Sequence, residues 1–154
     1  MSKPKLPELF QQNGKSHPTM ESEILSAKAA EALADLGGMY REQVAGDIEM
    51  MAALLEQAKS ADSDERLNQI RGDFFDKMHD LKGQGRTFGY PLLTDLGAFA
   101  CDFLRHKTAV TDEDLALLDR VLADVRIVHQ NQMVGEKPQK SQAIYRRIKK
   151  AYHG

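Results

Sequence analysis

The fold of this chain is decided by the stretch Phe75-Asp-Lys-Met-His79-Asp-Leu-Lys82-Gly83-Gln-Gly85-Arg-Thr-Phe88-Gly89. His79 lies inside a pattern typical of an α-helix, with a lysine three positions later and a glycine four positions later. Positions i, i+3 and i+4 share one face of a helix. The imidazole of His79, the ammonium group of Lys82 and the bare backbone of Gly83 are therefore expected to lie side by side.

The apolar residues around this stretch indicate how far the histidine is buried. A stripe with helical spacing is formed by Leu67, Ile70, Phe74, Met78 and Leu81. His79 follows Met78, about 100° further round the helix, and so falls at the edge of the stripe. The sequence therefore predicts a half-exposed histidine on an otherwise buried helix.

Helical periodicity continues through the rest of the chain, and no strand or hairpin pattern competes with it. Thr19, an Asp62–Glu65 capping box, Pro91 and Thr111 indicate helix starts. Gly37-Gly38 is expected to end the first helix. The helices are expected at residues 20–36, 39–59, 63–85, 90–106, 112–133 and 139–152. This pattern predicts an all-α fold, in which 39–59, 63–85, 90–106 and 112–133 form an antiparallel four-helix bundle with additional N- and C-terminal helices.

Three regions are expected along the chain. Residues 1–18 are polar and contain three prolines, which indicates a flexible N-terminal tail. Residues 19–135 hold the helical bundle. Residues 136–154 contain six basic residues and one acidic residue, which predicts a basic C-terminal helix.

Composition excludes several classes of function. Lys plus Arg is 21 and Asp plus Glu is 23, so a net charge of −2 indicates neither nucleic acid nor a membrane as partner. Cys101 is the one cysteine, which rules out an intramolecular disulfide and suits the cytoplasm. No stretch reaches the roughly 20 apolar residues of a membrane span, and there is no secretory signal and no nucleotide-binding motif. No metal site is expected, because Asp76-x-x-His79 stands alone and no Glu-x-x-His occurs.

The residues around His79 resemble the signature of histidine-containing phosphotransfer (HPt) domains. That signature is His-x-Leu-Lys-Gly, with an apolar residue and a glycine nine and ten positions after the histidine. Here it reads His79-x-Leu81-Lys82-Gly83 and then Phe88-Gly89. The family's run of small residues after Lys-Gly is less well kept, since Gln84 and Arg86 are bulky. The resemblance covers residues 35–106.

This resemblance implies a phosphorelay intermediate of two-component signal transduction. His79 would accept a phosphoryl group from an aspartate of a receiver domain and pass it to a response regulator. Neutral imidazole is a competent nucleophile near its free pKa of about 6.5. The remaining site residues divide into three groups: phosphate charge stabilisation by Lys82; partner docking by Phe75, Gly83 and Arg86; and turn and packing by Gly85, Phe88 and Gly89.

The expected partners are receiver domains of a hybrid histidine kinase and of a response regulator. The chain is expected to have no kinase activity and no cofactor of its own, with any Mg²⁺ bound by the receiver. An alternative is a non-catalytic helical adaptor that binds a signalling partner through residues 139–152 and the N-terminal tail. A further alternative is the substrate domain of a larger kinase.

Three roles are left open by the sequence. Asp76, three residues before His79, either accepts a hydrogen bond from the imidazole or is a surface carboxylate. Arg86 is either a second cation at the site or a solvated arginine. Phe75 is either an anchor for the partner or part of the core, and the two roles are compatible.

Overall fold

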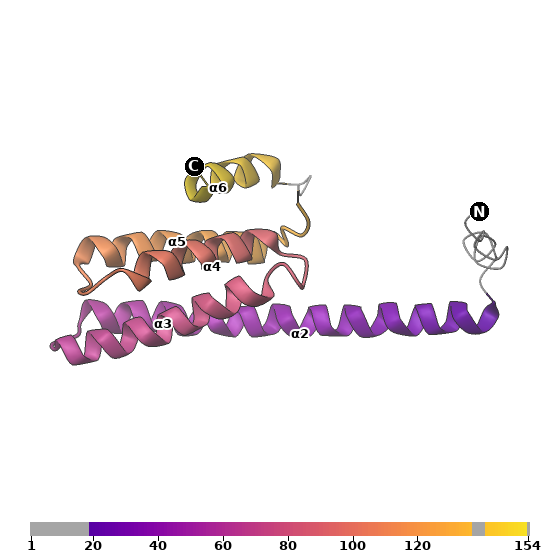
Figure 1. The fold of residues 1–154 in the computed structure, drawn as a ribbon, viewed down its shortest axis with the longest axis horizontal. Coiled ribbons are helices and arrows are strands. Elements are labelled where there is room, and N and C mark those ends of the chain that lie inside the picture. Colours follow the sequence, from indigo (N-terminus) through magenta and orange to yellow (C-terminus); the bar gives the residue numbers. More distant parts are fainter. Residues whose placement is uncertain (1–18, 137–140, 154) are drawn as a thin grey trace, which may run out of the picture. The chain divides into compact units, whose positions relative to one another are not determined.

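The computed structural model describes residues 19–136 and 141–153, and these form five α-helices and no strand (Figure 1). The expectation of an all-α protein is confirmed. The predicted N-terminal tail, residues 1–18, lies outside the described residues. Within the described part, no helix has the length and apolar character needed to cross a membrane. The helices are α2 (Met20–Lys59), α3 (Asp64–Gln84), α4 (Pro91–Arg105), α5 (Asp112–Gln130) and α6 (Gln142–His153).

The chain divides into two compact units, Met1–Gly38 and Met39–Gly154, and the boundary falls inside α2. In the first unit, Thr19 caps the helix as predicted, because its hydroxyl accepts a hydrogen bond of 3.2 Å from the backbone N–H of Ser22. Nearly all side chains from Met20 to Gly38 are exposed.

The predicted helix end at Gly37-Gly38 is wrong. Both glycines are helical, and neither has the positive φ of a left-handed C-cap. Each glycine costs a helix only about 1 kcal/mol relative to alanine, and strong helix formers lie before and after the pair. The helix therefore continues through both positions.

The second unit is built on one hydrophobic core, to which all five described helices contribute from Tyr40 onward. α3 packs most extensively on α4, and α4 also packs on α5 and α6 (Figure 1). The predicted stripe of α3 is confirmed, since Ile70, Phe74, Met78 and Leu81 are buried while Leu67 lies at the margin. The other fully buried side chains include Val44, Met51, Leu55, Leu92, Leu93, Leu96, Val121, Met133 and Ile148.

Two helix starts are fixed by side-chain caps. α3 begins one residue later than predicted, because Ser63 rather than Asp62 caps it: the Ser63 hydroxyl accepts a 3.1 Å hydrogen bond from the N–H of Arg66. A serine hydroxyl is at least as good a cap as a carboxylate. α5 begins as predicted, with a capping box between Thr111 and Asp114.

Helix α4 approaches the backbone of α3 at Gly97. A Cβ atom at Gly97 would lie 2.6 Å from the carbonyl oxygen of Met78 and 2.6 Å from the backbone nitrogen of Lys82. One turn further along α4, the buried Cys101 lies with its sulfur 4.0 Å from the carbonyl oxygen of Phe75. Only small side chains allow two helices to come this close, so α4 supports α3 directly behind the segment that carries His79.

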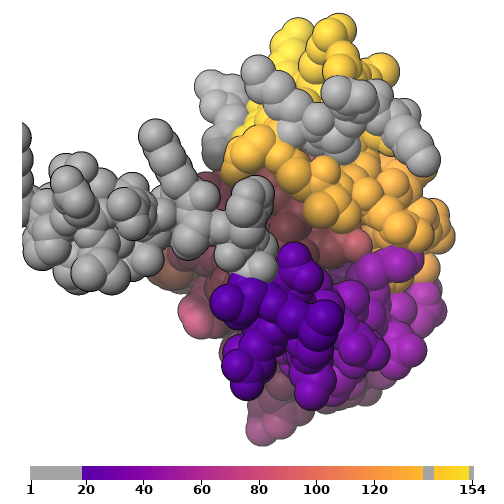
Figure 2. Space-filling model, turned by 90° about the vertical axis from the view of Figure 1, so that its right-hand side faces the viewer, coloured from indigo at the N-terminus to yellow at the C-terminus, as the bar shows by residue number. Residues whose placement is uncertain are grey.

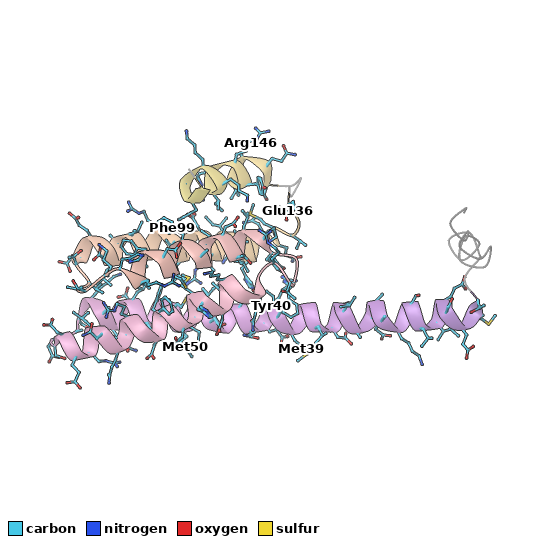
Figure 3. All side chains as sticks on the ribbon, in the orientation of Figure 1. Met39, Tyr40, Met50, Phe99, Glu136 and Arg146 are labelled. Atoms are coloured by element: carbon cyan, nitrogen blue, oxygen red, sulfur yellow. The ribbon has the colours of Figure 1, made fainter. Side chains whose placement is uncertain are left out.

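Helix α6 is amphipathic and lies over α4 and α5. Ile148 is fully buried, and the ring of Tyr152 packs edge-on against Phe99 at 4.9 Å between centroids. Asp124 of α5 accepts hydrogen bonds of 2.6 Å from both Arg147 and Tyr152. Arg146 points away from α4 and α5 (Figure 3), and the space-filling view shows α6 seated over the orange segment at the end of α5 (Figure 2). The apolar face of α6 therefore completes the core, and its basic face remains exposed.

The approach at Gly97 can be tested by adding one methyl group. Gly97→Ala is expected to lower the free energy of unfolding by about 1–3 kcal/mol, because two backbones must move apart to admit the Cβ. The control is Gly72→Ala, at an exposed position of α3 where an added Cβ meets nothing within 4 Å. This control should raise the free energy of unfolding by about 0.5–1 kcal/mol. Urea unfolding of both variants measures the difference, and equal effects would contradict the close packing.

Asp114 is expected to make stability depend on acid pH. Burial alone raises the pKa of this carboxyl, but hydrogen bonds from Thr111 and Lys107 outweigh burial and lower it. The Asp114 contribution is therefore complete above the unfolded-state pKa of about 3.9 and is lost as the pH falls through the lower folded-state value. At pH 7, Asp114→Asn should be about 1 kcal/mol less stable than the unsubstituted chain, and this difference should begin to narrow below roughly pH 4. Urea unfolding at several pH values measures the gap, and a constant gap would exclude this role.

Candidate functional site

His79 is exposed on α3, one residue after the fully buried Met78. The ring of Phe75, one turn earlier, lies nearly parallel to the imidazole, with 6.1 Å between the ring centroids and an angle of 24° between the planes. Phe75 is half-buried and packs against the core. The phenylalanine thus connects the core to the imidazole and forms an apolar surface beside it.

The His79 imidazole has no hydrogen-bond partner among the described residues. Asp76, although near in sequence, is exposed and does not contact it in this way. The tautomer of the free ring is therefore not fixed by a neighbouring side chain of the described part.

Lys82 and Gly83 lie one turn after His79 on the same helix. Lys82 is half-buried, and its backbone rests on Gly97 of α4. A Cβ atom at Gly83 would meet nothing within 4 Å, so packing within the described chain does not require a glycine there. Residues i, i+3 and i+4 share a helix face. The imidazole, the ammonium group and an open stretch of backbone therefore form one surface, which we call the His79 surface.

The α3–α4 turn is held by two glycines and by a hydrogen bond to Thr94. A Cβ at Gly85 would lie 2.8 Å from the backbone nitrogen of Thr94, so this glycine allows the turn to close on α4. The hydroxyl of Thr94 accepts a 2.8 Å hydrogen bond from the N–H of Arg86. Gly89 has φ +88°, a conformation that other residues rarely adopt. These contacts fix the end of α3 soon after Lys82.

Phe88 fastens the same turn to α2. Its ring stacks on that of Tyr40 at 4.4 Å between centroids and 11° between planes, and Tyr40 points from α2 toward this turn (Figure 3). Burial, followed by the charges of Tyr90 and Asp47, raises the pKa of Tyr40 to about 12. The phenol therefore stays neutral and adds no charge near the site.

Arg86 is exposed, and its guanidinium lies 4.0 Å from the carboxylate of Asp95. Asp95 also accepts a 2.9 Å hydrogen bond from Lys149 of α6. The Arg86 side chain is 62 % exposed, whereas the Asp95 side chain is buried at 7 %. Asp95 keeps its hydrogen bond from Lys149 if the Arg86 side chain turns toward another surface.

Two supporting features were not found from the sequence. The close approach at Gly97 is the first of them. In the sequence it is marked by a glycine inside a helix, in a segment of small residues that also contains Ala98 and Ala100. The other feature is an ion pair of 3.1 Å between Lys77 of α3 and the buried Asp47 of α2. In the sequence, the sign of this ion pair is the position of Asp47, an acidic residue next to the apolar stripe of α2. Both features fix the backbone of α3 around His79.

Within residues 19–136 and 141–153, no group of three or more His, Cys, Asp or Glu side chains is arranged to hold a metal ion. No protein-family model, no curated protein and no solved structure matches this chain. Functional inference therefore depends on the His79 surface and on the motif that runs through it.

Exposure of the imidazole predicts that stability does not depend on it. His79→Gln should change the free energy of unfolding by no more than about 0.5 kcal/mol, because an exposed side chain without hydrogen bonds is removed. Met78→Ala, at the neighbouring buried position, should cost about 2–5 kcal/mol. Urea unfolding of the two variants provides the comparison. A large loss for His79→Gln would show that the ring is part of the packed structure.

Proposed function

We propose that this chain is a cytoplasmic phosphorelay intermediate of the HPt type. His79 accepts a phosphoryl group from an aspartate of one receiver domain and passes it to an aspartate of a response regulator. The observation that carries the proposal is an exposed imidazole with a lysine and an open glycine on the same helix face. The proposal includes an antiparallel four-helix bundle, formed by α2 from Tyr40 onward, α3, α4 and α5.

The transfer step needs a nucleophile and a charge partner. The lone pair of a neutral His79 ring nitrogen attacks phosphorus, the N–P bond forms, and the bond from phosphorus to the aspartyl oxygen breaks. The aspartate leaves as a carboxylate and needs no proton. Lys82, three residues from His79, is positioned to balance the charge on the phosphoryl oxygens. The reverse steps deliver the group to the second receiver.

Docking requires that the active-site loops of a receiver reach the imidazole. The vacant space at Gly83 leaves room for a loop backbone, and Phe75 offers an apolar contact on the other side of His79. Arg86, which is exposed in the turn that follows α3, can pair with the acidic residues that bind Mg²⁺ in the receiver. The chain contributes no metal ligand in this scheme, since Mg²⁺ belongs to the receiver.

Rigid support makes this geometry useful. The backbone of α3 at Met78 and Lys82 rests on Gly97, and Lys77 is paired with Asp47. A preorganised nucleophile avoids the entropic cost of ordering the reacting groups in each transfer. The structural contacts therefore lie behind His79, and the side that faces a partner is left without them.

The direct test is label transfer from a panel of phosphorylated receiver domains to the full chain. The expected product carries an acid-labile, base-stable phosphate, as a phosphohistidine does, and His79→Gln removes it. Lys82→Ala should retain folding and slow transfer by roughly ten- to a hundred-fold, because the charge partner is lost. Labelling that survives His79→Gln, or no transfer from any receiver, would overturn the proposal.

A docking control separates chemistry from binding. Gly83→Leu places a side chain in the open space next to His79 and should reduce transfer, while Ala116→Leu, at an exposed position of α5, should not. If a partner binds equally well to His79→Ala and to the unsubstituted chain, and no phosphate moves, the adaptor role replaces the phosphorelay role.

A further inference from the structure

The helical segment of the first unit exposes an unusual amount of apolar surface. Leu25, Leu33 and Leu36 are 64, 69 and 49 % exposed, and Met20 and Ile24 are exposed as well. None of these residues belongs to the hydrophobic core, which begins at Tyr40. Contiguous apolar surface on a helix commonly marks an interaction site.

The apolar residues follow the spacing of a helix-pairing seam. Leu25, Ala29, Ala32 and Leu36 are separated by four, three and four residues, which is the alternation of positions a and d in a heptad. Leu33 borders the seam. The two alanines lie at the centre of the seam and the two leucines at its ends. Small central residues allow a second helix to come close, and the leucines then pack against residues at both ends.

We propose that this segment pairs with the same segment of a second copy of the chain, in antiparallel orientation. In this arrangement Leu25 of one copy packs on Leu36 of the other, and Ala29 packs on Ala32. The arrangement has two-fold symmetry, so each contact occurs twice. Position for position, a leucine meets a leucine and an alanine meets an alanine, and no large side chain meets an alanine.

Charge complementarity selects both the partner and the orientation. Lys28 and Asp35 are seven residues apart and flank the seam on one side, at equivalent heptad positions. In the antiparallel pair, Lys28 of each copy lies opposite Asp35 of the other, which gives two ion pairs. In a parallel pair, Lys28 would instead face Leu33, which carries no charge, and Asp35 would face the position of Tyr40, which is buried in the core. The charges therefore favour a second copy of this chain in the antiparallel orientation.

The same row of residues sets the limits of the pairing. Glu21 and Glu42 are the next members of the row that contains Lys28 and Asp35. In the antiparallel register they meet as like charges beyond the two ends of the seam, which confines pairing to residues 22–39. An interface of this length is short, so the expected dissociation constant is on the order of micromolar.

The oligomeric state of the full chain tests the seam. Sedimentation equilibrium over a range of concentrations around the micromolar value should show a monomer–dimer equilibrium. Leu36→Asp should weaken dimerisation by at least about a hundred-fold, because it places a charge in the seam. Ala34→Asp, on the opposite face of the same helix, should leave dimerisation unchanged. Circular dichroism shows whether each variant keeps its helix content.

The orientation is tested by exchanging charges. Lys28→Glu alone should weaken the dimer about ten-fold, because two ion pairs become two repulsions. Adding Asp35→Lys should restore the original affinity, since each pair is then reversed. A chain that is monomeric at every concentration would overturn the proposal, and the apolar face would then be covered by another part of the chain or by another protein. A dimer that the double exchange does not restore would exclude the antiparallel register.

The proposed dimer is independent of the phosphorelay function. Leu36→Asp lies in the first unit and is expected to transfer phosphate from a receiver to His79 at the rate of the unsubstituted chain. An unsubstituted chain that dimerises but accepts no phosphate would overturn the phosphorelay proposal alone. An unsubstituted chain that accepts phosphate at His79 but stays monomeric would overturn the dimer proposal alone.

Discussion

The contact on which the second unit depends is the approach of α4 to the backbone of α3 at Gly97. A Cβ atom at this position would lie 2.6 Å from both the Met78 carbonyl oxygen and the Lys82 backbone nitrogen. Met78 and Lys82 lie one residue before and three residues after His79. The backbone that carries the imidazole is therefore supported from behind by another backbone, without a flexible side chain in between. A protein interior packed in this way resists deformation. The backbone at His79 is therefore held in place, although the imidazole ring itself is exposed.

The glycines of this region act in two different ways. Gly85 and Gly97 lack side chains because the neighbouring backbone occupies the space, and Gly89 has a φ of +88° that favours glycine. Gly83 has free space around it, so the contacts of the described chain do not explain it. A glycine in a helix that costs about 1 kcal/mol and brings no internal packing is consistent with a surface that must accept a partner. Gly72, also on α3, has the same open surroundings, so it is the position of Gly83 beside His79 that the proposed docking uses.

Helix α2 shows that one element can meet two environments. From Tyr40 onward its apolar residues enter the core, and its Asp47 pairs with Lys77 of α3. In the first unit the same helix exposes Leu25, Leu33 and Leu36. Apolar residues recur at helical spacing in both parts. Apolar periodicity predicts that one face of a helix is buried. It does not predict whether that face packs against the same chain or against another molecule.

Local sequence by itself determined the helical class, the apolar stripe of α3, the caps at Thr19 and Thr111, and the placement of His79 at the edge of that stripe. These depend on neighbours within about one turn, which the sequence shows directly. The path of α2 through Gly37-Gly38 and the use of Ser63 as a cap were decided by small energy differences between alternatives that local patterns do not resolve. Only the tertiary structure decided that Gly97 supports α3, that Phe88 stacks on Tyr40, and that Gly83 is open while Gly85 is closed. Those outcomes depend on residues distant in the sequence that come together only when the helices pack.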